Sequence, residues 1–341
     1  MDAPVPHRRR PRYPGKNPRR FKDKYKELDP SAHPETVAKV RAAGKTPAGS
    51  HVPIMVREIL EVLRPQPGEI AVDCTLGHGG HTRALIERIL PGGHLLGLDV
   101  DPLELPRTTA LLRSSGFGPD VFTAHRGNFA GLPAALAARG LVGADLILAD
   151  LGVSSMQLDQ PTRGFSTKFA GPLDMRMNPD RGVTAAQWLE KVSATKLGSV
   201  LTGHADEPHA AELAAALAGK SFALTTDLAA AIRHTLRRLP PDEADLGARR
   251  VFQAIRIAVN EEFSALETFL RALPSCLNPG GRAALLTFHS GEDRRVKHAL
   301  RGAHRAGLYR EVARDVIRPS AEERRANPRS TSAKLRWAVR A

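Results

Sequence analysis

The sequence has little of what marks secreted, membrane-spanning or metal-binding proteins. Only 2 of its 341 residues are cysteine, Cys74 and Cys276, which excludes a disulfide framework, and no Cys/His cluster has the spacing of a zinc site. The sequence has no run of about 18 apolar residues, the length that could cross a membrane. The amino terminus lacks the apolar segment of a secretory signal. We therefore expect a cytoplasmic protein, and we assign it no metal.

Positive charge is unevenly distributed along the chain. The formal net charge is +14, and residues 1–50 hold 13 basic and 5 acidic side chains, whereas residues 291–341 hold 14 and 6. The body between these ends is close to neutral. Basic clusters gain affinity for polyanions by releasing counterions from phosphates. Two basic ends therefore favour a polyanionic partner, although charged tails that keep the protein soluble explain them equally well.

Most of the chain alternates short apolar strands with helical segments, a pattern that builds a parallel sheet covered by helices. The predicted strands are 70–74, 95–98, 121–123, 145–148, 283–288, 311–317 and 334–339. The alternation is broken between about 160 and 246, where only helical stretches are predicted, at 185–190, 212–218 and 227–238. Outside this region the predicted helices are 34–43, 54–63, 132–139, 251–273 and 292–304, and 279–281 is a predicted turn.

The fold class that follows is α/β, one open sheet interrupted by an all-helical insertion. The predicted division is a basic, proline-rich extension at 1–48, a first part of the sheet domain at 49–158, the helical insertion at 159–248 and a second part of the sheet domain at 249–341. The length fits about two domains at about 150 residues each.

Two motifs at the first two strands point to a nucleoside-containing ligand. The glycine-rich turn from Asp73 to His81 follows the first strand, and glycines there let a ligand approach the backbone closely, although a plain tight turn explains them as well. Asp99 ends the second strand, where an acid accepts hydrogen bonds from ribose hydroxyls. Dehydrogenases and methyltransferases both use such an acid, and the absence of the dinucleotide glycines favours a methyl donor. Capping of the following helix suits Asp101 better than Asp99.

The third and strongest motif starts at Asp150, at the end of the fourth strand. It continues through Ser155 and Gln157 to Asp159, and is followed by Thr162–Ser166 and Gly171–Met177, all dense in glycine, serine and charged residues. In a doubly wound sheet this loop lies opposite the cofactor turn. We expect its polar side chains to face the reacting group.

Together these stretches closely resemble the RsmH (MraW) family of bacterial ribosomal RNA small subunit methyltransferases, and the resemblance runs from His51 to the carboxyl terminus. Further segments that carry it are Gly127–Phe129, Phe252–Glu261, Pro279–Arg282, Phe288–Arg294 and Asn327–Ser330. The resemblance implies a Rossmann-like class I methyltransferase domain with a helical, RNA-recognising insertion. It also implies transfer of a methyl group from S-adenosylmethionine to the N4 amine of a cytidine in the decoding region of 16S rRNA. The implied partner is this RNA or the small ribosomal subunit.

The resemblance also implies the site residues. Donor binding falls to Gly79, Gly80, His81, Asp99, Phe129, Asp150 and Gln157. We assign Asp150 the catalytic role of accepting a hydrogen bond from the amine that attacks the methyl group. Contacts to RNA are predicted for Arg163, Phe165, Arg176, His289 and Arg294. For Phe165 a place in the core is an equal alternative, and His289 is more often a buried structural histidine.

The chain departs from the usual family pattern at a few positions, at His78, Asn178 and Gly291, and in its basic extension, which we take to be an addition of this chain alone. These departures leave open the alternative that this protein is a paralogue that methylates another RNA site. A non-catalytic RNA-binding assembly factor is a second alternative, against which the complete set of donor motifs argues. A dehydrogenase is a remote third.

Deleting residues 1–48 should weaken RNA binding and reduce its dependence on salt, because fewer phosphates would be neutralised. The affinity for S-adenosylmethionine should not change. Filter binding at several salt concentrations and calorimetry with the donor measure the two effects. Equal loss of both affinities would show instead that the extension is part of the fold.

Overall fold

The computed structural model describes residues 52–341, except for the side chains of residues 155 and 156. The predicted extension at 1–48 and its helix at 34–43 lie outside the described residues. No described helix is long and apolar enough to cross a membrane.

Seven strands form one sheet in the order β3-β2-β1-β4-β5-β7-β6. Strands β1 to β5 are parallel to one another, whereas β7 runs antiparallel between β5 and β6. The bounds of the strands are β1 Ile70–Asp73, β2 His94–Asp99, β3 Phe122–Arg126, β4 Ala144–Asp150, β5 Leu277–Thr287, β6 Tyr309–Val312 and β7 Lys334–Arg340. Because the first five strands are parallel, their carboxyl ends lie along the same edge of the sheet.

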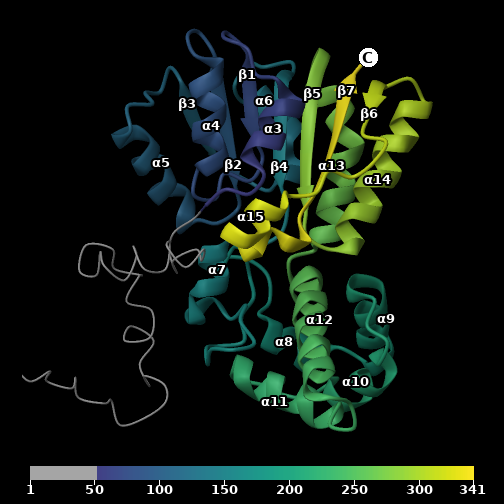
Figure 1. Cartoon of the computed structure of the whole chain (residues 1–341). Coiled ribbons are helices and arrows are strands. Elements are labelled where there is room, and N and C mark those ends of the chain that lie inside the picture. The colour runs from purple at the N-terminus through teal and green to yellow at the C-terminus, as the bar shows by residue number, and fades with distance from the viewer. Residues whose placement is uncertain (1–51) are drawn as a thin grey trace, which may run out of the picture. The chain divides into compact units, whose positions relative to one another are not determined.

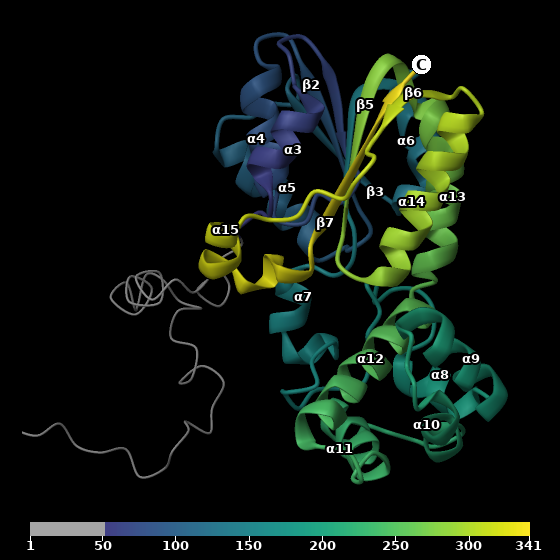
Figure 2. The same cartoon turned by 45° about the vertical axis from the view of Figure 1, so that its right-hand side comes forward.

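The central strands are apolar on both faces because helices cover both sides of the sheet. One core contains Ala71, Leu95 and Leu146 with α3 (Val56–Leu63), α4 (Gly80–Ile89) and α5 (Glu104–Ser114). The other contains Val72, Leu96 and Ile147 with α6 (Leu132–Ala137), α13 (Glu262–Cys276) and α14 (Ser290–Arg305). Successive residues of each strand therefore enter opposite cores, as the two-residue repeat of a strand requires. Figure 2 shows the two helix layers on either side of the sheet.

A separate helical unit lies beyond the carboxyl ends of the parallel strands (Figure 1). It consists of α8 (Ala185–Lys191), α9 (Ala194–Ala205), α10 (Ala210–Leu217), α11 (Thr225–Thr235) and α12 (Pro241–Val259). Its core extends from Phe165 to Ile255, past the predicted boundary at 248. We therefore place the end of the insertion near residue 259, where α12 ends.

The predicted single helix at 251–273 is wrong, because the structure has two helices there, α12 and α13. The break falls at Asn260 and Glu261, and Glu261 has a positive φ of 51°. The side chain of Asn260 donates to the backbone oxygen of Met175 at 2.7 Å and accepts from the backbone nitrogen of Met177 at 2.7 Å. This break lets the chain leave the insertion, return to the sheet and hold the loop at residues 175–177.

Smaller differences concern the ends of elements. The predicted turn at 279–281 lies within β5, at a shift in its register with β4. The predicted strand 311–317 is β6, which ends at Val312, while Ile317 forms only an isolated bridge with Leu335. The predictions gave no bounds for α4 or for α5, the helix that follows Asp101, and did not include α7 (Ser155–Asp159), α9 and α15 (Ala321–Ala326).

Candidate active site

Three carboxylates end neighbouring strands at one edge of the sheet: Asp73 ends β1, Asp99 ends β2 and Asp150 ends β4. In open α/β sheets ligands bind outside this edge, where the strand order reverses. The reversal here lies between β1 and β4, the pair that carries Asp73 and Asp150.

Asp73 organises the turn that follows it. Its carboxylate accepts from the backbone nitrogen of Thr75 at 3.0 Å and from the hydroxyl of Thr82 at 2.7 Å. The hydroxyl of Thr75 in turn accepts from the backbone nitrogen of Asp150 at 2.7 Å. Asp73 is almost fully buried. It therefore links the glycine-rich turn to β4.

The glycine-rich turn needs its glycines. Gly77 and Gly79 have positive φ angles of 47° and 73°, which other residues rarely adopt. A Cβ atom on Gly79 would lie 3.1 Å from Thr108, and one on Gly80 would lie 3.0 Å from Pro53. The turn leads directly into α4, which begins at Gly80. The two glycines therefore let Thr108 and Pro53 pack closely against the start of this helix.

Asp99 lies against this turn. One carboxylate oxygen accepts from the backbone nitrogen of Gly77 at 2.8 Å and the other from that of Asp101 at 2.9 Å. Burial raises the pKa of Asp99 to about 6, despite the two backbone hydrogen bonds. Each oxygen retains a further lone pair for a ligand hydroxyl.

Gln157 and Arg163 both bind the buried carboxylate of Asp101. The amide nitrogen of Gln157 donates to it at 2.9 Å, and the guanidinium of Arg163 forms an ion pair with it at 2.7 Å. Asp101 also accepts from the backbone nitrogen of Leu103 at 2.9 Å, close to the start of α5. Burial acts to raise the pKa of Asp101, but Gln157 and Arg163 more than offset it, so the pKa is lowered.

Arg163 and Phe165 lie inside the protein. The guanidinium of Arg163 also donates to the backbone oxygens of Arg176 and Met177, at 3.1 and 2.9 Å, and the side chain is only 7% exposed. Phe165 packs in the helical core. Both side chains are buried in this structure, and Phe165 lies in the core, which is one of the two alternatives weighed for it.

Asp150 faces His81 across the start of α4. Its Oδ2 lies 3.6 Å from Nδ1 of His81, while Oδ1 is buried without a hydrogen-bond partner. Burial raises the pKa of Asp150 to about 6, helped by Asp73 and Glu292 and opposed by His81. Nε2 of His81 lies 2.9 Å from the backbone oxygen of Ile54, which can only accept, so Nε2 carries the proton.

Phe129 begins a short 3₁₀ segment, Phe129–Gly131, directly after β3. It is half-buried, and its ring packs edge-on against Phe269 at 5.5 Å between centroids. The side chain of Asn128 caps the segment by accepting from the backbone nitrogen of Ala130 at 2.9 Å. An apolar ring is thus held next to the strand end that carries Asp99, because β2 and β3 pair at Asp99 and Arg126.

The other predicted RNA contacts differ in exposure. Arg176 is half-buried in an ion pair with Asp174, with N–O distances of 2.7 and 2.8 Å. His289 caps α14, and its Nε2 lies 3.2 Å from Glu292, which is buried. Arg294 is 56% exposed and pairs with Asp206 at 3.0 Å.

Several residues of this network were not predicted as site residues. Asp101 was predicted only to cap a helix, and Asn260 and Arg329 appeared only inside motifs. Arg329 forms an ion pair with Asp159, at 2.7 and 2.9 Å, and so connects the carboxyl-terminal segment to α7 (Ser155–Asp159), which contains Gln157. Tertiary pairing assigns these roles, and no signal in the local sequence specified them.

The residues at this edge suit S-adenosylmethionine. The donor carries two cationic centres, a sulfonium and an ammonium, together with ribose hydroxyls and an adenine. The edge offers two half-buried acids of raised pKa, a glycine-rich turn and an aromatic ring. The unpartnered Oδ1 of Asp150 is a free acceptor of the kind a cationic or N–H group would satisfy.

The fold and this site define a Rossmann-like methyltransferase that uses S-adenosylmethionine. Residues 48–341 match the MraW methylase family. The chain is 48% identical to ribosomal RNA small subunit methyltransferase H 1 of Agathobacter rectalis, with 100% of both chains covered. It is 47% identical to the protein of the same name from Lachnoclostridium phytofermentans, covering 98% of this chain and 93% of that one. The chain therefore belongs to the MraW methylase family.

Among solved structures, a putative rRNA-methylase from Clostridium thermocellum is similar with a TM-score of 0.42 and 11% identity, covering 86% of this chain and 100% of that one. The two bacterial relatives correct one prediction. Because they match 100% and 98% of this chain, the basic extension is not an addition of this chain alone.

Asp150→Asn should stabilise the donor-free protein at pH 7.5. The folded-state pKa of about 6 lies above the ordinary value of 3.8, so the ionised carboxylate is disfavoured in the folded protein. The contribution of Asp150 to the free energy of unfolding is therefore fully present at low pH and is lost as pH rises through 6. The gain should be about 2 kcal/mol, at about 1.4 kcal/mol per pKa unit with some loss to screening.

Urea unfolding between pH 4.5 and 7.5 measures this gain, which should shrink as pH falls below 6. Glu190→Gln, an exposed residue of α8, serves as the control without such a trend. An Asp150→Asn protein less stable than wild type at pH 7.5 would contradict the raised pKa.

Proposed function

We propose that this protein transfers a methyl group from S-adenosylmethionine to the N4 amine of a cytidine in the decoding region of small-subunit ribosomal RNA. The observation that carries the proposal is the environment of Asp150, a half-buried carboxylate beside the cofactor turn whose Oδ1 is buried without a hydrogen-bond partner among the described residues. The names of the relatives, ribosomal RNA small subunit methyltransferases, support the RNA class.

The donor would be held by the residues around the turn. Backbone groups of Gly79 and Gly80 would contact it, Asp99 would accept from its ribose, and Phe129 would lie against its adenine. Gln157 would contact the donor from the segment after β4, where its amide nitrogen donates to Asp101. When bound, S-adenosylmethionine supplies a methyl group on an already activated leaving group, so the protein mainly has to align the reactants.

The nucleophile needs more help than the methyl group. The lone pair of a cytosine N4 amine is delocalised into the ring, and an acceptor for its N–H draws the amine toward a nucleophilic geometry. Asp150 would be that acceptor through Oδ1. With a pKa of about 6, Asp150 is ionised at neutral pH yet basic enough to take the proton that the amine loses.

His81 would position Asp150. Its Nε2 lies 2.9 Å from the backbone oxygen of Ile54, and its Nδ1 lies 3.6 Å from Oδ2 of Asp150. His81 would thereby orient the carboxylate so that Oδ1 is left for the amine.

The target base would enter between the sheet edge and the insertion, after leaving its stack. The insertion is tied to the sheet domain on two sides. Arg126 at the end of β3 pairs with Asp180 at 2.6 Å, and Arg294 of α14 pairs with Asp206 at 3.0 Å. Arg176, His289 and Arg294 remain the proposed RNA contacts, whereas we assign Arg163 and Phe165 the role of holding the loop after α7.

Mapping of modified nucleotides tests the proposed reaction. Small-subunit RNA from a strain lacking the gene should lack one N4-methylated cytidine in the decoding region, and the purified protein should restore it. Restoration of a methyl group at another RNA position would identify a paralogue with a shifted target. Donor binding without transfer to any RNA would support an assembly factor instead.

Asp150→Asn should reduce kcat for methyl transfer by about 10²- to 10⁴-fold, the usual range for loss of a general base. The Kd for S-adenosylmethionine should change by less than about tenfold, because Asp99 and the turn still hold the donor. Single-turnover tritium transfer and calorimetry measure the two quantities. Near-normal turnover with intact donor binding would rule out the proposed role of Asp150.

A further inference from the structure

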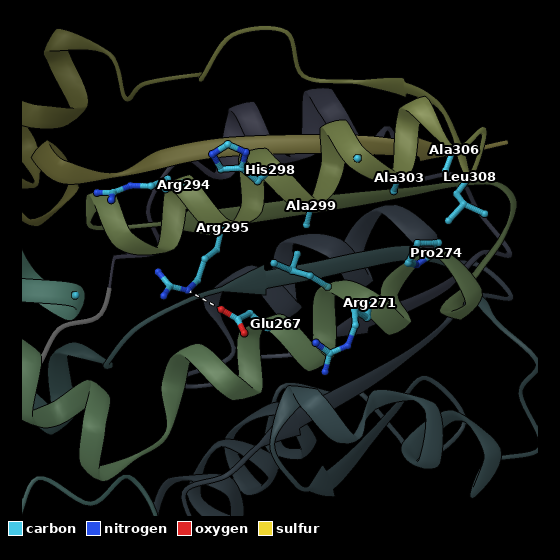
Figure 3. Close-up of a pocket in the computed structure, with 13 residues that line it drawn as sticks. Glu267, Arg271, Pro274, Arg294, Arg295, His298, Ala299, Ala303, Ala306 and Leu308 are labelled. Carbon is cyan, nitrogen blue, oxygen red and sulfur yellow. Dashed lines mark hydrogen bonds and ion pairs between the residues drawn. The ribbon is translucent and has the colours of Figure 1, made fainter. Parts of the chain in front are cut away.

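We propose that a groove between α13 and α14 binds the phosphate backbone of the RNA strand that flanks the target nucleotide. The inference rests on the proposed RNA substrate and adds a second contact surface outside the active site. The groove has a volume of about 830 Å³. Figure 3 shows it running along the two helices, with Arg294 at one end and Leu308 at the other.

The rim of the groove is basic and its floor is apolar. Arg271, Arg294, Arg295 and His298 line it together with a single acidic side chain, Glu267. The floor consists of small or aliphatic residues, among them Leu270, Ala299 and Ala303. The floor has no aromatic ring on which a base could stack, so we assign the groove to the sugar-phosphate backbone.

Four exposed basic side chains of α14 form one stripe, in which Arg294, His298, Arg301 and Arg305 follow each other at intervals of four, three and four residues. This spacing puts them on one face of the helix. Arg294 and His298 line the groove, and Arg301 and Arg305 continue the stripe beyond it. The stripe is about 16 Å long at 1.5 Å per residue. That length corresponds to about five nucleotides of a stacked strand at about 3.4 Å each.

The groove begins at the active-site edge of the sheet. Residue Ser290 starts α14 three residues after β5 ends at Thr287, on the edge that also carries Asp150. Gly203 of α9, a helix of the insertion, also lines the groove. An RNA strand with one nucleotide at Asp150 can therefore continue along α14. This continuity favours RNA over an acidic protein segment, which would have no reason to start at this edge.

The ion pairs at the groove are ones that phosphates can replace. Arg295 lies 3.0 Å from Glu267 across the groove, with side chains 29% and 51% exposed, and Arg294 pairs with the equally exposed Asp206. Partly and fully exposed ion pairs of this kind contribute little to stability. The guanidinium of Arg295 also lies 3.6 Å from the ring centre of Phe263, which holds it at the rim. Arg271 donates to Thr268, a neutral partner.

Gly302 provides a sharp test. It lies inside α14 and lines the groove, and a Cβ atom at this position would meet nothing within 4 Å. Gly302→Glu and Gly302→Gln should both fold, because replacing a helical glycine favours the helix. The two variants differ only in charge. Gly302→Glu should bind protein-free small-subunit RNA about tenfold more weakly than Gly302→Gln, with a salt slope lower by about 1.

Removing the acid should have the opposite effect. Glu267→Gln leaves Arg295 free for a phosphate and should bind RNA about threefold more tightly than wild type, a gain that a purely structural role of Glu267 would not produce. Arg271→Gln should weaken binding and lower the salt slope. Arg88→Gln, an exposed arginine of α4 on the opposite face of the sheet, is the matched control and should leave RNA binding unchanged.

Equal RNA affinity and equal salt slope for Gly302→Glu and Gly302→Gln would overturn the proposal. So would a defect of Gly302→Glu on assembled subunits but not on protein-free RNA, because the occupant would then be a protein. Binding is measured separately from methyl transfer. A wild-type protein that binds RNA without methylating it would refute the proposed function. The comparison of Gly302→Glu with Gly302→Gln would still test the groove.

Discussion

The arrangement of the site depends on one buried carboxylate, that of Asp101. It receives the guanidinium of Arg163, the amide of Gln157 and backbone N–H groups at the start of α5. Gln157 and Arg163 belong to one segment more than fifty residues from Asp101, whereas the N–H groups belong to residues that follow Asp101 directly. A buried charge is tolerated only when it is paired and hydrogen-bonded, so loss of either partner would leave an expensive unpaired group. Asp101 therefore fixes where the loop after β4 lies relative to the cofactor turn.

From Arg163 the network extends into the insertion. The same guanidinium holds the backbone oxygens of Arg176 and Met177, and Asn260 holds Met175 and Met177 from the other side. The loop at residues 175–177 is thereby clamped between the first and second halves of the chain. This clamp explains how a helical unit inserted into the sheet domain can present side chains to the sheet edge at a defined place.

The environment sorts the carboxylates of the site into two groups. Asp101, Asp174 and Glu292 have basic or hydrogen-bonding partners that lower their pKa against the effect of burial. Asp99 and Asp150 are half-buried without a full basic partner, and their pKa is raised to about 6. Acids of raised pKa in a pocket are candidates for ligand binding and proton transfer, whereas paired acids hold structure. The two raised acids are those that the strand-end motifs predicted as functional.

Local sequence determined the features that depend on short-range physics. Apolar runs and glycine turns predicted the strands that end at Asp73, Asp99 and Asp150, and parallel pairing then placed these residues at one edge. The helix predicted at 251–273 failed because its apolar repeat continues through Asn260 and Glu261, where tertiary hydrogen bonds break the helix. Only the tertiary structure assigned Arg163 and Phe165 to the interior and joined Asp101 to Gln157. A loop arginine looks the same in sequence whether it meets a phosphate or a buried carboxylate, because the partner that decides lies more than fifty residues away.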